Sequence, residues 1–360
     1  MRHASASPSM LSRVTADGHA ESTLMSATPL VSVIMPVRNG GAWLEEAVAS
    51  ILSQSFTDLE LIIVDDHSTD DALTRLVHRD PRLKILASDG EGIVAALNHG
   101  IAQSRGRFLA RMDADDIAVL TRIASQLEYL ERHPDVGICG ARVTIFSGVP
   151  GESAAEGYRV YEEWINGLTR PEDIARQIYV ESPIPHPTAM LRREVMQKLG
   201  GYRDTPWAED YDLWLRAHVA GVRMGKPHEC LLHWRDHDGR LSRQSARYSR
   251  EQFTAARACY LAQQYAGRRE VVIWGAGESG KRLCDALTDH ALRPRAFIDV
   301  NPRLIGGRKR GLPVLAMEEI DSVGNALILA AVARRGARAE IRAWLEENGR
   351  REGTDYIFAA

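Results

Sequence analysis

LARMDADDIA, residues 109–118, places three carboxylates within four positions directly after an apolar run. One of Asp113, Asp115 and Asp116 could cap a helix predicted over residues 117–133, but a cap needs only one acceptor. Carboxylates this close raise one another's pKa unless a cation is present, and hard divalent ions such as Mg²⁺ and Mn²⁺ take oxygen ligands. Because Mg²⁺ typically combines one or two carboxylates with substrate phosphates, the stretch predicts a metal site that faces a phosphate.

The sequence around this stretch alternates between short β-branched runs and helical patterns. Strand-type runs occur at residues 31–36, 59–66, 83–88 and 107–112, and helical patterns occur between them at 43–54, 68–79 and 93–104. This alternation predicts a mainly parallel sheet with crossover helices, and such sheets bind ligands at the carboxyl ends of their strands.

Three polar segments follow predicted strand ends. They are VRNGG at residues 37–41, DDHSTD at 65–70 and DADD at 113–116. We expect them to converge on one crevice. For Asp65, Asp66 and Asp70, capping of the following helix is an open alternative.

Composition limits the classes of protein to consider. A chain of 360 residues suits two domains, and a formal net charge of −3 gives no global attraction to nucleic acid or anionic membrane. The four cysteines form no C-x-x-C pair, which argues against a zinc site or a disulfide framework. No apolar stretch approaches the roughly 20 residues that cross a bilayer. We expect a cytoplasmic protein with a mobile tail over residues 1–28; peripheral association with the inner face of the membrane stays open.

Four motifs in a fixed order carry a family resemblance. VSVIMPVRNGG, SILSQSFTDLELIIVDDHSTD, ALNHGIAQSRGRFLARMDADD and EDYDLWLR resemble the family 2 glycosyltransferases with a GT-A fold, over about residues 30–242. A lone D-x-D would be weak evidence, whereas the order of four motifs is specific. The resemblance implies an α/β domain over residues 29–245 that binds a nucleotide-diphosphate sugar on a mixed, mainly parallel sheet.

The resemblance also implies donor-binding residues. Asp113 and Asp115 resemble the D-x-D element that holds the metal and the ribose-diphosphate, and Asp116 resembles a further metal contact. Asp66 resembles the acceptor for the uracil imide, which fits uridine without excluding thymidine or guanosine. Pro36 to Arg38 resembles the loop that lines the nucleotide, although Arg38 has the alternative of a solvated surface charge.

Catalytic residues follow from the same resemblance. Asp210 resembles the base that takes the proton from the acceptor hydroxyl, and a base opposite the leaving group implies inversion at the anomeric carbon. The alternative is a helix N-terminus enriched in acids. LLHWRDHDGRLSRQ, residues 231–244, resembles the segment that closes over the donor, with His237 as a contact to phosphate or metal. His186 and Pro187 precede a predicted strand near the acceptor side, with no role assigned.

The sequence departs from the family's usual pattern in the segment that follows DADD. Members often carry a proline there, where this chain has Val119 and Leu120 before Arg122. Only the local entry into the helix is affected.

The C-terminal third predicts a second unit. After a helical linker at 246–266, EVVIWGAGESGKRLCDALTDH gives a strand, a glycine turn and a helix within a Rossmann-like domain at 267–360. Gly275, Gly277 and Gly280, with Asp299 at the end of the next strand, match the dinucleotide fingerprint. The unit resembles small nucleotide-binding modules of sugar-modifying enzymes. A bound nucleotide or NAD and a turn kept for packing alone both remain open.

The leading hypothesis is transfer of a sugar from a nucleotide-diphosphate sugar, UDP-linked by the resemblance, to a hydroxyl of a glycan, polysaccharide or glycolipid. A sugar nucleotidyltransferase is the first alternative, but VRNGGAWLEE lacks the length and the lysine of that class's loop. A non-catalytic nucleotide-sugar-binding protein is the second. The acceptor depends on the irregular region around residues 150–185.

Overall fold

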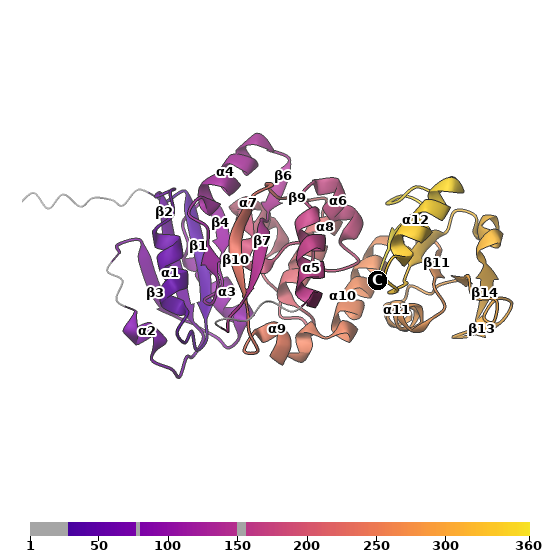
Figure 1. Cartoon of the computed structure of the whole chain (residues 1–360), viewed down its shortest axis with the longest axis horizontal. Coiled ribbons are helices and arrows are strands. Elements are labelled where there is room, and N and C mark those ends of the chain that lie inside the picture. Colours follow the sequence, from indigo (N-terminus) through magenta and orange to yellow (C-terminus); the bar gives the residue numbers. More distant parts are fainter. Residues whose placement is uncertain (1–27, 77–79, 150–155) are drawn as a thin grey trace, which may run out of the picture.

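A computed structural model describes residues 28–76, 80–149 and 156–360. The predicted tail at 1–28, apart from residue 28, lies outside the described residues. Figure 1 shows an elongated molecule with an N-terminal α/β unit at one end and the C-terminal sheet at the other. Within the described residues, no helix has both the length and the apolar character needed to cross a membrane.

The first sheet has seven strands. Their order is β3 (Leu83–Ala87), β2 (Leu59–Asp65), β1 (Val31–Val37), β4 (Phe108–Arg111), β8 (Met190–Arg192), β6 (Val136–Cys139) and β9 (Arg223–Gly225). The first four strands are parallel, and β8 runs antiparallel to both β4 and β6. The predicted mixed, mainly parallel sheet is therefore confirmed.

Both faces of this sheet are covered. Successive strand residues point to opposite sides, so neighbouring residues of β1 pack into different cores. Val33 and Met35 of β1 share a core with α1 (Leu44–Leu52) and α4 (Arg122–Arg132). Ile34 belongs to the opposite core with α3 (Ile93–Gln103), and that core also takes residues from α7 (Arg193–Leu199) and α8 (Glu209–Val219). The carboxyl ends of β1, β2 and β4 thus lie at one edge between two packed layers.

A smaller sheet joins β5 (Ile117–Ala118), β10 (Cys230–Asp236) and β7 (Arg142–Ser147). The helix predicted from residue 117 is wrong in its first turn, because Ile117 and Ala118 pair with β10 and the helix begins at Arg122. Val119 N donates to Leu231 O at 2.9 Å, so pairing with a distant strand replaces the first helical turn.

The remaining short helices of the N-terminal unit surround these sheets. They are α2 (Ala72–Arg75), α5 (Glu156–Gly167), α6 (Pro171–Gln177), α9 (Leu241–Gln244), and the 3₁₀ turns η1 (His186–Thr188) and η2 (Ala246–Tyr248). The helix predicted over 68–79 is α2, which is shorter; residues 77–79 lie outside the described ranges.

The C-terminal sheet has the order β13 (Arg308–Lys309), β14 (Leu312–Ala316), β12 (Phe297–Asp299), β11 (Val271–Trp274), β15 (Leu327–Ala330) and β16 (Tyr356–Phe358). All of its pairs except β13–β14 are parallel. Its helices are α11 (Glu278–Asp289), the 3₁₀ helix η3 (Met317–Val323) and α12 (Ala337–Glu347). This is the Rossmann-like α/β region expected from the sequence.

Helix α10 (Arg250–Tyr265) lies between the two units and packs into both. On the N-terminal side, Tyr260 Oη donates to Asp212 Oδ1 at 2.6 Å, and Phe253 stacks on Tyr211. On the C-terminal side, Arg257 Nη1 donates to Ala359 O at 2.7 Å. The helix is thus a shared core element, while the exact domain boundaries remain a prediction.

Candidate active site

A cleft of about 1380 Å³ opens at the carboxyl edge of the seven-stranded sheet. Nine residues named individually in the sequence analysis line it: Pro36, Arg38, Asp66, Asp113, Asp115, His186, Pro187, Asp210 and His237. Asp116 lies buried directly behind this wall. The convergence of the three polar segments therefore occurs as expected for parallel strands.

The first two loops hold each other in place. Asn39 Oδ1 accepts from Thr69 N at 2.7 Å, and Asp70 Oδ2 accepts from Gly41 N at 2.9 Å. Asp65 Oδ1 accepts from Ser68 N within its own turn. Neither acid caps α2, whose first turn has no side-chain cap. Asp65 and Asp70 therefore shape the loops at this side of the cleft and do not start a helix.

Asp66 has a different environment. Its side chain is buried, and Oδ1 accepts from Gly92 N, ahead of α3, at 2.8 Å. Oδ2 lies 3.7 Å from the guanidinium of Arg38, which is mostly exposed. One oxygen is thus fixed by the fold and the other meets an exposed guanidinium at the cleft, which is compatible with contact to a ligand.

The three acids of DADD gather as predicted. Asp113, Asp115 and Asp116 each offer a carboxylate oxygen, and these oxygens lie within 4.8 Å of one another. Asp113 forms an ion pair with the buried Arg111 of β4. Asp115 Oδ2 lies 2.7 Å from His237 Nε2. The cluster thus joins the end of β4 to the segment after β10.

Asp116 gives the strongest indication of an ion. Its Oδ1 accepts from Arg235 N at 2.8 Å, but its buried Oδ2 has no hydrogen-bond partner among the described residues. Burial, together with the charges of Asp113 and Asp115, raises the pKa of Asp116 well above its ordinary value. An unpaired buried carboxylate oxygen is costly, and a divalent cation would satisfy it. An all-oxygen set with one histidine at its edge fits Mg²⁺ or Mn²⁺.

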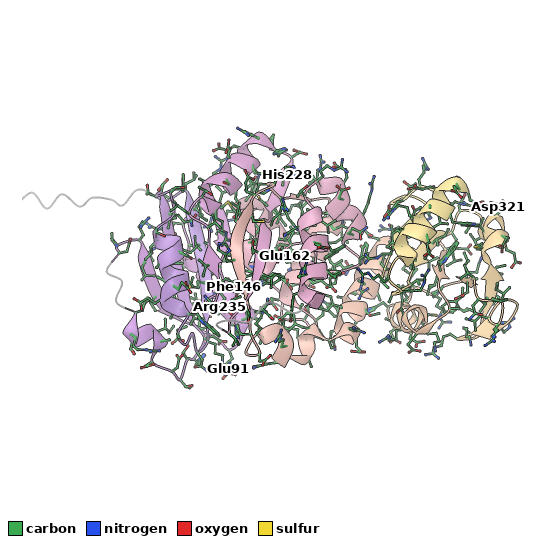
Figure 2. The ribbon with its side chains drawn as sticks, in the orientation of Figure 1. Glu91, Phe146, Glu162, His228, Arg235 and Asp321 are labelled. Carbon is green, nitrogen blue, oxygen red and sulfur yellow. The ribbon has the colours of Figure 1, made fainter. Side chains whose placement is uncertain are left out.

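Arg235 was missed by sequence reasoning. Besides its backbone contact to Asp116, its Nε donates to Asp115 O at 2.7 Å. Its guanidinium lies over the rings of Trp43 and Phe146, at 5.2 and 4.6 Å from their centroids. Figure 2 shows Arg235 beside Phe146. The only sequence signal was its place in the closing segment, two residues before His237.

Asp210 stands in the first turn of α8. Its Oδ1 accepts from Tyr211 N at 2.7 Å, and Ser182 Oγ lies 3.5 Å from Oδ2. Burial and the neighbouring charge of Glu209 raise the pKa of Asp210 to about 8. A carboxylate with that pKa accepts a proton readily near neutral pH.

Glu209 is the opposite case. Only 1% of its surface is exposed, and its carboxylate accepts from Tyr248 Oη at 2.8 Å and lies 3.5 Å from His186 Nδ1. Burial alone would raise the pKa of Glu209, but the hydrogen bonds from His186 and Tyr248 lower it to about 2. Two adjacent acids are thus separated into a fixed anion and a proton acceptor, the pattern that marks acid–base assignments.

Comparison with known proteins agrees with this cleft. The model of glycosyl transferase family 2 matches residues 32–200. The putative glycosyltransferase EpsE of Bacillus subtilis is 33% identical over 233 residues, which cover 62% of this chain and 80% of that protein. An uncharacterised glycosyltransferase of Haemophilus influenzae is 32% identical, covering 61% of this chain and 69% of that protein. This chain belongs to glycosyl transferase family 2.

Further relatives of this family 2 glycosyltransferase support its fold and class. The O-antigen biosynthesis glycosyltransferase WbnJ of Escherichia coli is 28% identical over 61% of this chain and 84% of its own. Among solved structures, residues 1–349 of S. aureus TarS, in complex with UDP-GlcNAc, superpose with a TM-score of 0.53 at 18% identity, over 74% and 73% of the two chains. The GT-A fold is thereby supported, and the nucleotidyltransferase and non-catalytic hypotheses are set aside.

The glycine turn of the C-terminal sheet lies outside the glycosyltransferase cleft. Gly275 has a φ of +110°, and a Cβ on Gly280 would lie 1.8 Å from Gly275 O, so both glycines are required by the backbone. Asp299 Oδ2 accepts from Ala276 N at 2.7 Å, and Oδ1 accepts from Asn301 N at 2.9 Å. These contacts favour the packing interpretation. A Cβ on Gly277 would meet nothing within 4 Å, and a nucleotide there stays a prediction.

Proposed function

We propose that this glycosyltransferase is an inverting, metal-dependent enzyme that moves a sugar from a UDP-sugar to a hydroxyl of a glycan, polysaccharide or glycolipid. The observation that carries the proposal is the presence, in one cleft, of a carboxylate cluster with an unpaired buried oxygen and of an acid whose pKa is raised to about 8.

In this proposal the donor occupies the side of the cleft formed by the first two loops. Asp66 and Arg38 contact the base, and Pro36 lines the nucleoside. The UDP-GlcNAc and UDP complexes of S. aureus TarS lend support to uridine as the base. Thymidine and guanosine remain the alternatives to be tested.

The acidic cluster serves the leaving group. Asp113, Asp115 and Asp116 would hold Mg²⁺ or Mn²⁺, with His237 at its edge, and such an ion stabilises negative charge on the departing diphosphate without proton transfer. Arg235 holds the cluster in position, because it donates to the side chain of Asp116 and to the backbone carbonyl of Asp115.

The acceptor hydroxyl approaches Asp210. Asp210 takes the hydroxyl proton as the acceptor oxygen bonds to the anomeric carbon and the bond to the diphosphate breaks. Attack from the face opposite the leaving group inverts the anomeric configuration. Glu209 cannot replace Asp210 as base, since its carboxylate is held by His186 and Tyr248.

The decisive experiment compares wild type with Asp210→Asn in single-turnover transfer and in donor affinity. We expect transfer to slow by roughly 10²- to 10⁴-fold, the scale of general-base catalysis, while donor affinity stays unchanged. Asp204→Asn is the matched control, because it also removes one negative charge from the lining of this cleft. Asn caps a helix about as well as Asp, so near-normal transfer in folded Asp210→Asn would leave only the helix-terminal role.

Two further measurements test the rest of the proposal. A panel of sugar nucleotides with Mn²⁺, scored by released nucleoside diphosphate, identifies the donor; release from a GDP-sugar alone would overturn uridine. NMR of the product gives the anomeric configuration, and retention would exclude inversion.

A further inference from the structure

Arg111 is the last residue of β4 and lines the catalytic cleft, but the proposed mechanism gives it no part. Its backbone is fixed on both sides, because Arg111 N donates to Ala189 O at 2.8 Å and Arg122 Nη2 donates to Arg111 O at 2.5 Å. Only 5% of its side chain is exposed. A guanidinium in such a place is costly to bury unless its N–H groups find acceptors.

The N–H groups of Arg111 are satisfied less well than those of the other buried arginines. Four of these, within the described residues, each donate hydrogen bonds to two or three protein acceptors: Arg122, Arg216, Arg235 and Arg257. Arg111 forms an ion pair with Asp113, but its buried Nε and Nη1 have no hydrogen-bond partner in the part of the chain that the structure describes. The remaining nitrogen, Nη2, is the one that can face the cleft. The fold thus gives Arg111 a counter-charge and leaves hydrogen-bonding capacity for a ligand.

Arg111 lies close to both of the groups that the proposed mechanism uses. Its guanidinium pairs with Asp113 of the acidic cluster, which serves the departing diphosphate. Its charge also reaches the base, because burial and Glu209 raise the pKa of Asp210 and Arg111 opposes that rise. In an inverting transfer, the anomeric carbon lies between the leaving group and the base. The transferred sugar is therefore the part of the donor that comes to Arg111.

The charges around Arg111 indicate which kind of sugar oxygen fits. Asp113 already compensates the guanidinium, and Asp115 and Asp210 add negative charge to the same cleft. A sugar carboxylate would face these like charges, whereas a hydroxyl or an acetamido oxygen accepts a hydrogen bond without that cost.

We propose that Arg111 donates a hydrogen bond to a neutral oxygen of the transferred sugar and thereby helps to select the donor. This inference rests on the proposed function, since it takes the cleft to hold a nucleotide-diphosphate sugar. The contact involves the sugar and not the nucleotide. Substitution of Arg111 should therefore change recognition of the sugar and leave recognition of the nucleoside diphosphate unaltered.

The test measures the affinity of the full chain for UDP and for UDP-sugars by calorimetry, with Mn²⁺ and without acceptor. The neutral sugars are glucose, galactose and their N-acetylamino forms, and UDP-glucuronate carries the carboxylate. In wild type, at least one neutral UDP-sugar should bind more tightly than UDP, and UDP-glucuronate should gain nothing over UDP. Arg111→Lys keeps the charge beside Asp113 but loses the planar fork. Its affinity for the neutral UDP-sugar should fall about 10-fold or more, the scale of a hydrogen bond from a charged group, while its affinity for UDP stays that of wild type.

Arg250→Lys is the matched control. Arg250 is an exposed arginine of the same cleft outside the acidic cluster, so both affinities should stay unchanged. Analogues of the best-binding sugar that lack one hydroxyl or the acetamido group locate the contact. One of them should bind wild type about 10-fold more weakly than the parent sugar, and Arg111→Lys should not distinguish the two. If Arg111→Lys does not fold, the analogue series in wild type still tests the inference.

Four results would overturn the inference. An unchanged affinity for the UDP-sugar in Arg111→Lys, or an equal loss for UDP, would leave Arg111 only its role beside Asp113. Equal affinity of wild type for every analogue would show that no sugar oxygen is recognised. Tightest binding of UDP-glucuronate would exclude a neutral oxygen. Absence of UDP binding in wild type would remove the proposed uridine donor and this inference with it, so the two failures are distinguishable.

Discussion

The seven-stranded sheet and the C-terminal sheet of this glycosyltransferase both carry acids at the carboxyl ends of parallel strands but use them differently. In the N-terminal sheet, acids crowd together, and Asp116 Oδ2 is buried without a hydrogen-bond partner in the part of the chain that the structure describes. In the C-terminal sheet, both oxygens of Asp299 accept backbone N–H groups, one from Ala276 in the glycine turn and one from Asn301. The comparison teaches that an acid at a strand end indicates a ligand only when the fold leaves it unsatisfied.

Because of this difference, we expect substitutions in the two sheets to change different properties, ligand binding in one and the free energy of unfolding in the other. Substitutions in the acidic cluster should weaken ligand binding with little loss of folding, because the native contacts there are strained by like charges. Substitutions in the glycine turn of the C-terminal sheet should lower the free energy of unfolding while leaving transfer unchanged in molecules that remain folded.

The largest effect is expected at Gly280. A methyl group there would collide with Gly275 O, a backbone atom that cannot move without breaking the turn. We expect Gly280→Ala to lose about 3 kcal/mol in the free energy of unfolding, the upper end of the range for overpacking. Gly277→Ala is the control, because its Cβ meets nothing within 4 Å, and it should cost less than about 0.5 kcal/mol. Urea unfolding of both variants checks this; equal stability would show that the turn does not constrain packing.

The same control variant sharpens the question of a nucleotide in the C-terminal sheet. A pyrophosphate at this turn needs the second glycine for close approach of the backbone. If NAD or a UDP-sugar binds the C-terminal unit, Gly277→Ala should abolish that binding without destabilising the chain.

Asp115→Asn should give the next largest effect. The change removes one charge from the acidic cluster while keeping its shape, so affinity for the nucleotide in the presence of Mn²⁺ should fall by about 10- to 100-fold. Stability should hold. Glu91→Gln, which removes a charge from the same cleft outside the cluster, serves as control (Figure 2). Unchanged Mn²⁺-dependent binding in Asp115→Asn, measured by calorimetry, would contradict the metal assignment.

Asp299→Asn should have a smaller effect, and on stability only. An amide in place of one carboxylate oxygen loses an acceptor for Ala276 N or Asn301 N, which costs about 1–2 kcal/mol. The single-turnover rate of the folded variant should equal that of wild type. A loss of transfer with normal stability would instead indicate a functional ligand at the C-terminal sheet.

Asp210 should also make the stability of the folded chain depend on pH. Its pKa rises from 3.8 to about 8 on folding, so between these values the folded chain holds a proton that the unfolded chain releases. The contribution of Asp210 to stability therefore falls as pH increases through this window and is lost above it. Asp210→Asn lacks this dependence. We expect its melting temperature to exceed that of wild type by an amount that grows from about pH 5 to about pH 9. A constant difference would show that the pKa is not raised.

Much of this site could be predicted from the sequence, because the carboxyl ends of neighbouring parallel strands necessarily meet. Asp66, Asp113 and Asp115 were placed together on that ground, and Asp210 by its motif. Arg235 was not found, since it reaches Asp115 O across 120 positions of the chain. The contrast between Glu209 and Asp210 also depends on burial and on Tyr248, which a linear pattern does not encode. The helix predicted from residue 117 begins only at Arg122, because residues 117 and 118 pair with the distant strand β10.

The bond from Arg257 to Ala359 O has a consequence for the order of folding. Arg257 lines the catalytic cleft, yet its guanidinium is held by a carbonyl 102 positions later in the chain. Contacts of such separation form late, and N-terminal units generally fold first during synthesis. In a nascent chain, the acidic residues of the cleft can therefore already be synthesised while Arg257 still lacks its contact to Ala359 O. The enzyme should become competent only after β16 has joined β15 at the edge of the C-terminal sheet.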